Sequence, residues 1–102
     1  MKKYRLSYLP LFDQDLAKAW HYIANKLHNP EAADNLIADV EAAVLKRLNA
    51  PESFEPYRSA KERKYSYYRI YVKNFSVFYV VKGEVMEVRR FLYQRRNFKE
   101  LL

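Results

Sequence analysis

The chain has 102 residues, of which half are apolar and 17% aromatic, and its formal net charge is +7. This length predicts a single domain over residues 1–102, and the apolar content is sufficient for a hydrophobic core. The sequence has no cysteine and no apolar run of membrane-spanning length, which excludes a disulfide framework and predicts a cytoplasmic protein that does not bind a membrane.

The N-terminal half predicts one strand followed by two helices. Residues 3–8 alternate between polar and apolar side chains, as in a short strand with one buried face. Apolar side chains recur at helical spacing over 11–27 and again over 33–48, and Asn29 followed by Pro30 is a suitable start for the second helix. Because very few residues join the two helices, they must pack as an antiparallel hairpin.

The C-terminal half predicts a meander of three antiparallel strands. These strands are expected at 65–72, 75–81 and 84–93, because the three runs are rich in Tyr, Phe, Val and Ile. Two-residue turns are expected at Lys73-Asn74 and Lys82-Gly83. Asn74 and Gly83, the only glycine of the chain, are expected to take positive φ there.

Less regular segments flank the meander. The segment 49–64 is predicted to be irregular, with Phe54 and Tyr57 anchoring it to the core. The tail 97–102 predicts one helical turn, whose two final leucines are free to dock on an apolar surface. Together the elements indicate an α+β fold in which an N-terminal strand and a helical hairpin pack on one face of an antiparallel sheet of about four strands.

The positive charge is concentrated in two segments. Residues 58–73 contain six bases and one acid, net +5, and residues 88–102 contain five bases and one acid, net +4, whereas residues 31–57 contain six acids and two bases, net −4. A field of one sign beside a sheet indicates an acidic or polyanionic partner. The plain alternative is that these charges only provide solubility.

Arginine and tyrosine are the candidate functional side chains. The sequence has no metal-ligand spacing and no glycine-rich phosphate loop, so we expect neither a metal nor a cofactor. His21 and His28 lie on or just after the first helix, away from the basic segments, and are interpreted as surface or packing residues. We expect Arg90, between apolar strand neighbours, to be structural and paired with a helix acid. Trp20, in the first helical stripe, is expected in the core.

Two side chains keep alternative interpretations. Arg69 lies among tyrosines, where stacking on aromatic rings and contact with a phosphate remain equally open. Tyr93 fits either stacking on a base or closure of the core. The weak catalytic candidates are Arg69, Tyr93 and Arg96. The residues expected to bind a target or partner are Arg69, Arg89, Arg95, Arg96 and Lys99.

The order of strand, helix pair, meander and basic tail resembles the RelE/ParE family of toxins from type II toxin–antitoxin pairs. The resemblance covers nearly the whole chain and is closer to the ParE-like branch. It rests on the order and spacing of NPEAA at 29–33, LI at 36–37, VE at 40–41, Leu48 and Pro51, YRI at 68–70, VKNF at 72–75, VFY at 77–79 and RFLYQRRN at 90–97.

The departures from RelE-type toxins concern the residues that cut messenger RNA. The resemblance implies two lysines on the first meander strand, where this chain has Arg69 and Tyr71, and an arginine on the second, where it has Ser76. Arg96 matches the last arginine of the set, and the tail tyrosine falls near Leu101 or Leu102. Most of the RNA-cutting set is therefore changed, which leaves enzymatic activity undecided.

ParE-type toxins also lack the RNA-cutting set and are associated with inhibition of DNA gyrase, so the resemblance favours a ParE-like toxin that inhibits bacterial growth through this target. The alternatives are a ribosome-dependent messenger RNA endonuclease and a degenerate member that only binds its partner or nucleic acid. The resemblance implies a cognate antitoxin that is short, acidic and partly disordered, in a possible hetero-oligomer with the toxin. We expect the antitoxin to cover the rim near Arg69 and Arg95-Arg96 and the grooves of the helix hairpin.

Overall fold

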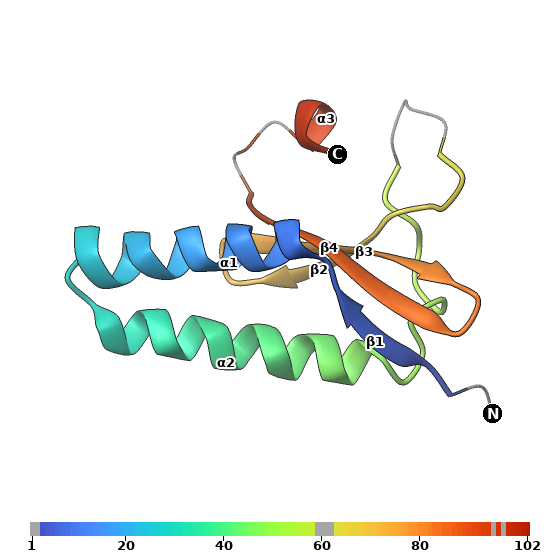
Figure 1. Ribbon diagram of the computed structural model, residues 1–102, viewed down its shortest axis with the longest axis horizontal. Coiled ribbons are helices and arrows are strands. Elements are labelled where there is room, and N and C mark those ends of the chain that lie inside the picture. Colours follow the sequence, from blue (N-terminus) through green and yellow to red (C-terminus); the bar gives the residue numbers. More distant parts are fainter. Residues whose placement is uncertain (1–2, 59–62, 95, 97) are drawn as a thin grey trace.

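The structure is a computed structural model that describes residues 3–58, 63–94, 96 and 98–102 (Figure 1). Its elements in chain order are β1 (Arg5–Tyr8), α1 (Pro10–His21), a π-helical turn η1 (Tyr22–Lys26), α2 (Pro30–Arg47), β2 (Tyr68–Val72), β3 (Phe75–Lys82), β4 (Val85–Tyr93) and α3 (Phe98–Leu101). The order and type of these elements agree with the sequence prediction. None of the helices in the described ranges is long and apolar enough to cross a membrane.

The two long helices form the predicted hairpin, with α1 and η1 running side by side with α2 (Figure 1). The predicted start of α2 is confirmed, because the Asn29 side chain accepts a hydrogen bond from the Ala32 amide at 3.1 Å and Pro30 occupies the first helical position. His28 reverses the chain between the helices with φ of +52°. The connection is therefore short enough to fix the helices as antiparallel neighbours.

The sheet has the strand order β1-β4-β3-β2. The β2–β3–β4 meander is antiparallel, as predicted, but β1 pairs in parallel with β4, from Arg5 opposite Val85 to Tyr8 opposite Val88. The α+β fold is confirmed, and its sheet is mixed rather than wholly antiparallel. A single alternating strand has the same pattern in either orientation, so the sequence could not distinguish them.

The β2–β3 turn at Lys73-Asn74 lies where the sequence predicted it, whereas the start of β2 and the β3–β4 turn differ from the prediction. The strand β2 begins at Tyr68 rather than at residue 65, and the β3–β4 turn is Gly83-Glu84 rather than Lys82-Gly83. In both hairpins the first residue of the turn has the positive φ, +52° at Lys73 and +59° at Gly83. The expectation of positive φ at Asn74 was wrong, because the residue ahead of it makes the reversal.

Apolar side chains cover both faces of the sheet. The larger cluster, which includes Phe12, Leu36 and Tyr79, fills the space between the helices and the sheet. A second cluster on the opposite face is built on Phe78 and Leu92 and is covered by aromatic side chains of 57–67 and by the tail. The prediction of one covered face was therefore incomplete, and the near-continuous burial of β3 reflects contact on both sides.

The irregular segments contribute unequally to this second cluster. Tyr57 packs edge-on against Phe78, with ring centroids 5.3 Å apart, as the sequence predicted. The terminal Leu101 and Leu102 also pack there, so the apolar surface on which they dock belongs to their own chain. The expectation for Phe54 was wrong, because this ring is 49% exposed and lies under the Arg47 guanidinium, 3.5 Å from its centroid.

The β3–β4 turn provides a test of this backbone geometry. A Cβ on Gly83 would meet no atom within 4 Å, so the cost of Gly83→Ala comes from the left-handed backbone alone. We expect urea unfolding to show a loss of about 1 kcal/mol for Gly83→Ala and a smaller loss for Gly83→Asn, because Asn tolerates this conformation. Equal losses for the two variants would contradict this explanation.

Candidate functional site

The sheet face opposite the helices collects the basic side chains of the meander. We call it the arginine face and define it by Arg69, Ser76, Phe78, Arg89 and Arg90. The β3–β4 register passes from Phe78 opposite Arg90 to Tyr79 opposite Val88, so Arg89 is an extra residue in β4. Such a β-bulge interrupts the alternation of side chains along a strand. Two consecutive arginines, Arg89 and Arg90, can therefore lie on the same face.

Arg69 lies in an aromatic cage on this face. Its Nε donates to the buried Ser76 hydroxyl at 2.7 Å. Its guanidinium carbon lies 4.3 to 6.0 Å from four ring centroids, those of Tyr71, Phe98, Phe78 and Tyr57. The stacked arrangement considered in the sequence is thus present. In the part of the chain that the structure describes, no carboxylate lies within salt-bridge distance of Arg69, which leaves its charge available to an anion.

Arg90 is held by a carboxylate from the helix layer. Its Nε and Nη2 donate to the two oxygens of Asp15 in α1, at 2.7 and 3.0 Å, and its Nη1 donates to the Leu101 carbonyl at 3.0 Å. Asp15 also accepts from the Phe91 amide at 3.0 Å. The hydrogen bond with Asp15 raises the pKa of Arg90 above its ordinary value, although partial burial acts against it. Arg90 therefore has the helix-acid partner that the sequence predicted.

The other predicted binding residues lie at the borders of this face. Arg89 donates to Glu87 at 2.8 Å; burial alone would lower the pKa of Arg89, but its hydrogen bonds with Tyr67 and Glu87 raise it. Arg96 and Lys99 are exposed, beyond the end of β4 and on α3. Arg95 lies outside the described residues. The ring of Tyr93 is 40% exposed and packs edge-on against Phe75, so the predicted residues do not converge on one point.

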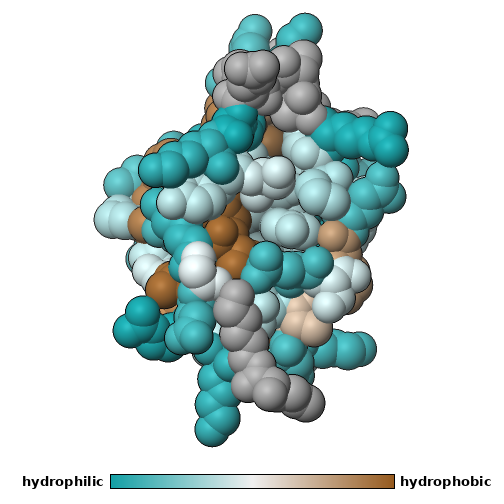
Figure 2. All heavy atoms as spheres, turned by 90° about the vertical axis from the view of Figure 1, so that its right-hand side faces the viewer, coloured by the Kyte–Doolittle hydropathy of each residue, from teal (hydrophilic) through white to brown (hydrophobic). Residues whose placement is uncertain are grey.

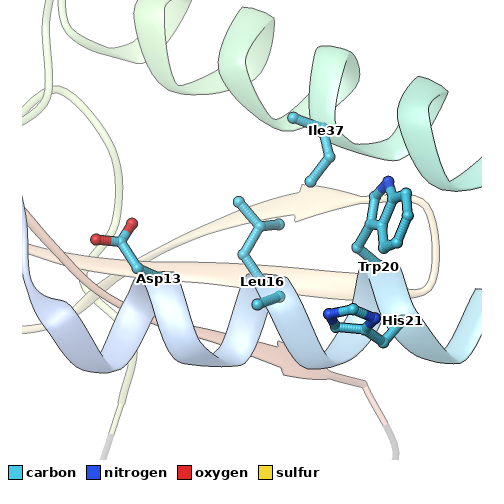
Figure 3. Close-up of a pocket in the computed structure, with 6 residues that line it drawn as sticks. Asp13, Leu16, Trp20, His21 and Ile37 are labelled. Carbon is cyan, nitrogen blue, oxygen red and sulfur yellow. The ribbon is translucent and has the colours of Figure 1, made fainter.

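A groove runs along the outer side of the helix hairpin. It has two recesses of about 280 and 250 Å³ that share Asp13 and Leu16. Figure 3 shows the first recess, with Leu16 and Trp20 of α1 directed toward α2 and Ile37 directed back toward α1. The second recess is lined by Tyr8, Phe12, Asp13, Leu16, Val40, Glu41 and Leu45. The groove therefore combines an apolar floor with two carboxylates at its rim.

The sequence predicted grooves on the helix hairpin, but it did not predict correctly which side chains line them. Trp20 was expected in the core, yet it is only half-buried; its indole nitrogen donates to Asp34 at 2.9 Å and so links α1 to α2. Leu45 was not assigned to the apolar stripe of the second helix, and 57% of its surface is exposed. Its position off the stripe was the signal, available in the sequence, that the hairpin has a second apolar side.

The comparisons with known proteins agree with this architecture. The profile of a family described as "ParE toxin of type II toxin-antitoxin system, parDE" matches residues 6–98. The match spans more than half of the chain, so the class of protein is a small toxin of a type II toxin–antitoxin system. The chain belongs to the ParE toxin family. No curated protein gives a significant match.

Solved structures share the fold at low sequence identity. A chain of the chromosomal ParDE system from P. aeruginosa superposes with a TM-score of 0.70 and 19% identity, covering 89% of this chain and 96% of the other. The DinJ–YafQ toxin–antitoxin complex of E. coli gives 0.55 and 10%, with coverage of 89% and 92%. The archaeal RelE–RelB complex from Pyrococcus horikoshii OT3 gives 0.54 and 14%, with coverage of 93% and 99%.

The Arg90–Asp15 pair predicts a large effect on stability. Arg90→Ala would leave the Asp15 carboxylate, whose side chain is 9% exposed, without its cation. We expect the free energy of unfolding to fall by about 3 kcal/mol, since breaking a buried ion pair strands the remaining charge. The exposed Arg96→Ala should change it by less than about 0.5 kcal/mol. Urea unfolding of Arg90→Ala, Asp15→Asn and the double variant would measure the coupling energy between the two side chains. If the losses of the single variants simply add up in the double variant, the pair does not contribute as proposed.

Proposed function

We propose that this chain is a growth-inhibiting toxin whose target is DNA gyrase. The observation that carries the proposal is the burial of Ser76 and its hydrogen bond with Arg69. RNA-cutting relatives are expected to have an arginine at this position, whereas here a fully buried serine hydroxyl accepts the Arg69 Nε. The arginine that would contact RNA is thus replaced by a buried serine whose hydroxyl holds Arg69 in place.

The chemistry available around Arg69 supports the same conclusion. Cleavage through the 2′-hydroxyl of RNA requires a base, an acid and cations around the phosphate. His21 and His28 are exposed on the helix hairpin, in the layer on the other side of the sheet. Leu101 and Leu102 pack into the second cluster where the resemblance implies a tyrosine. Arg69 and Arg96 therefore suit binding better than proton transfer.

A paired assay tests the target. We expect the purified protein to inhibit gyrase supercoiling and to leave messages intact in a translation reaction. Arg96→Ala should abolish inhibition without changing the melting temperature, because Arg96 is exposed. Arg5→Ala, an exposed arginine on β1, is the matched control and should retain inhibition. Discrete cuts within codons that disappear in Arg96→Ala would assign the endonuclease function instead, and an inactive protein that still binds its antitoxin would indicate a degenerate member.

We also propose that the hairpin groove binds a helical segment of the cognate antitoxin. Relatives of this fold have been crystallised as toxin–antitoxin complexes. Several apolar side chains beside the groove are exposed, among them Tyr8 and Leu45, as a helix-in-groove interface requires. Because Asp13 and Glu41 line the groove, the segment that fills it should carry basic side chains beside its apolar ones. We expect the acidic part of the antitoxin to bind the arginine face instead.

Two leucines of nearly equal exposure test this assignment. Leu45, 57% exposed, lines the groove, and Leu27, 56% exposed, lies at the far end of the hairpin outside it. We expect Leu45→Glu to weaken binding of the antitoxin encoded beside this gene at least about tenfold, because it places a carboxylate in an apolar contact. Leu27→Glu should bind normally in the same calorimetric titration. Equal affinities for both variants would place the antitoxin elsewhere.

A further inference from the structure

A second group of cations surrounds two tyrosines, apart from the Arg69 cage. We call it the tyrosine–cation cluster and define it by Arg63, Lys64, Tyr65, Tyr67, Lys82, Glu87 and Arg89. Lys64 and Lys82 place their amino groups 5.6 and 5.2 Å from the ring centroid of Tyr65. Arg63 and Arg89 place their guanidinium carbons 4.7 and 5.8 Å from that of Tyr67. Cations from three separate segments therefore meet on one surface.

The cluster carries an excess of positive charge. Its one carboxylate, Glu87, contacts Lys82 at 3.3 Å and Arg89 at 2.8 Å. Burial tends to raise the pKa of Glu87, but the hydrogen bonds from Arg89 and Lys82 outweigh burial and lower it, so Glu87 is ionised at neutral pH. Four cations against one anion leave a charge of +3 in the cluster.

Arg63 has hydrogen-bonding capacity that its described neighbours do not use. Its Nε and Nη2 atoms are buried, and neither has a hydrogen-bond partner among the residues that the structure describes. Buried polar groups in proteins are nearly always paired, so two open donors on one guanidinium require an explanation. The edge of the guanidinium formed by these two donors matches two oxygens of a phosphate or a carboxylate, and because both atoms are buried, the side chains that cover them must move for an anion to bind there.

We propose that the tyrosine–cation cluster binds the phosphate backbone of nucleic acid without reading its sequence. An acidic peptide is the other source of oxyanions, but protein partners generally require apolar anchors that become buried. None of the large apolar side chains exposed in the described residues belongs to this cluster. Tyr67 is only 7% exposed and supports the cations rather than offering its ring to a base. Backbone binding requires only positive charge and phosphate-matching donors.

The cluster shares Arg89 with the arginine face and extends from it to the β3–β4 turn. Lys82 ends β3 at the β3–β4 turn, and Lys64 and Tyr65 belong to the segment that precedes β2. Figure 2 looks onto the end of the molecule that carries this turn, where hydrophilic side chains surround a small apolar patch. The hairpin groove lies in the helix layer, so a nucleic acid at this end would leave the groove open.

Salt-dependent binding tests the proposal. Fluorescence anisotropy would follow the full-length protein with a labelled mixed-sequence DNA duplex and a labelled single-stranded RNA at several salt concentrations. Each lost phosphate contact lowers the slope of log affinity against log salt by about 0.9 for duplex DNA. We therefore expect Lys64→Gln with Lys82→Gln to reduce the slope by about 2, and Arg63→Gln by about 1.

Matched control variants distinguish binding at the cluster from a general effect of the protein's net charge. Lys26→Gln with Lys46→Gln removes two exposed cations from the helix layer, and Arg58→Gln removes an arginine whose side chain is 91% exposed. Both controls should keep the wild-type slope, and melting temperatures would confirm that every variant is folded. Equal loss in the controls would overturn the proposal. Binding of poly-glutamate that matches DNA binding and is lost in the lysine double variant would also overturn it, in favour of an acidic peptide.

Discussion

The architecture depends on the Asp15 carboxylate, which joins the helix layer to the sheet. The strand β1 pairs with β4 only as far as Tyr8 opposite Val88, so among the described residues no strand lies beside the second half of β4 on that side. Asp15 takes the place of the missing strand by accepting from the Phe91 amide, and it binds Arg90 through both oxygens. Arg90 then reaches the Leu101 carbonyl. One carboxylate thus fixes α1, the edge of β4 and the tail relative to one another.

The free edge of β2 is protected by a comparable use of side chains and loops. Arg47 of α2 donates to the Arg69 carbonyl at 3.4 Å and to the Tyr79 hydroxyl at 2.9 Å. The Tyr57 amide donates to the Tyr67 carbonyl at 2.6 Å, just before the strand. Edge carbonyls that are already bonded cannot recruit another strand, which limits edge-to-edge association of this sheet. The same contacts fix the backbone of Arg69.

The sheet separates two surfaces of opposite character. The helix layer presents an apolar groove with the carboxylates Asp13 and Glu41, and the other side presents Arg69, Arg89 and their basic neighbours. Two ion pairs join the layers, Arg90 with Asp15 at 2.7 Å and Lys73 with Asp39 at 3.0 Å, whereas Asp13, Glu41 and Arg69 have no ion pair among the described residues. A partner with an apolar, basic segment and an acidic segment can therefore contact both layers in a single orientation.

Local sequence determined the elements of this protein, and long-range contacts determined how its faces are used. Periodicity, the Asn29 cap and the single glycine identified the helices and the meander, because these signals act over a few residues. The parallel pairing of β1, the bulge at Arg89 and the covering of the second sheet face had no local signal. Asp15 and Arg90 are 75 residues apart, and Arg90 was predicted to have a helix acid without any means of choosing which. Only the tertiary structure determines which acid pairs with Arg90, because packing brings together side chains that are far apart in the sequence and share no local pattern.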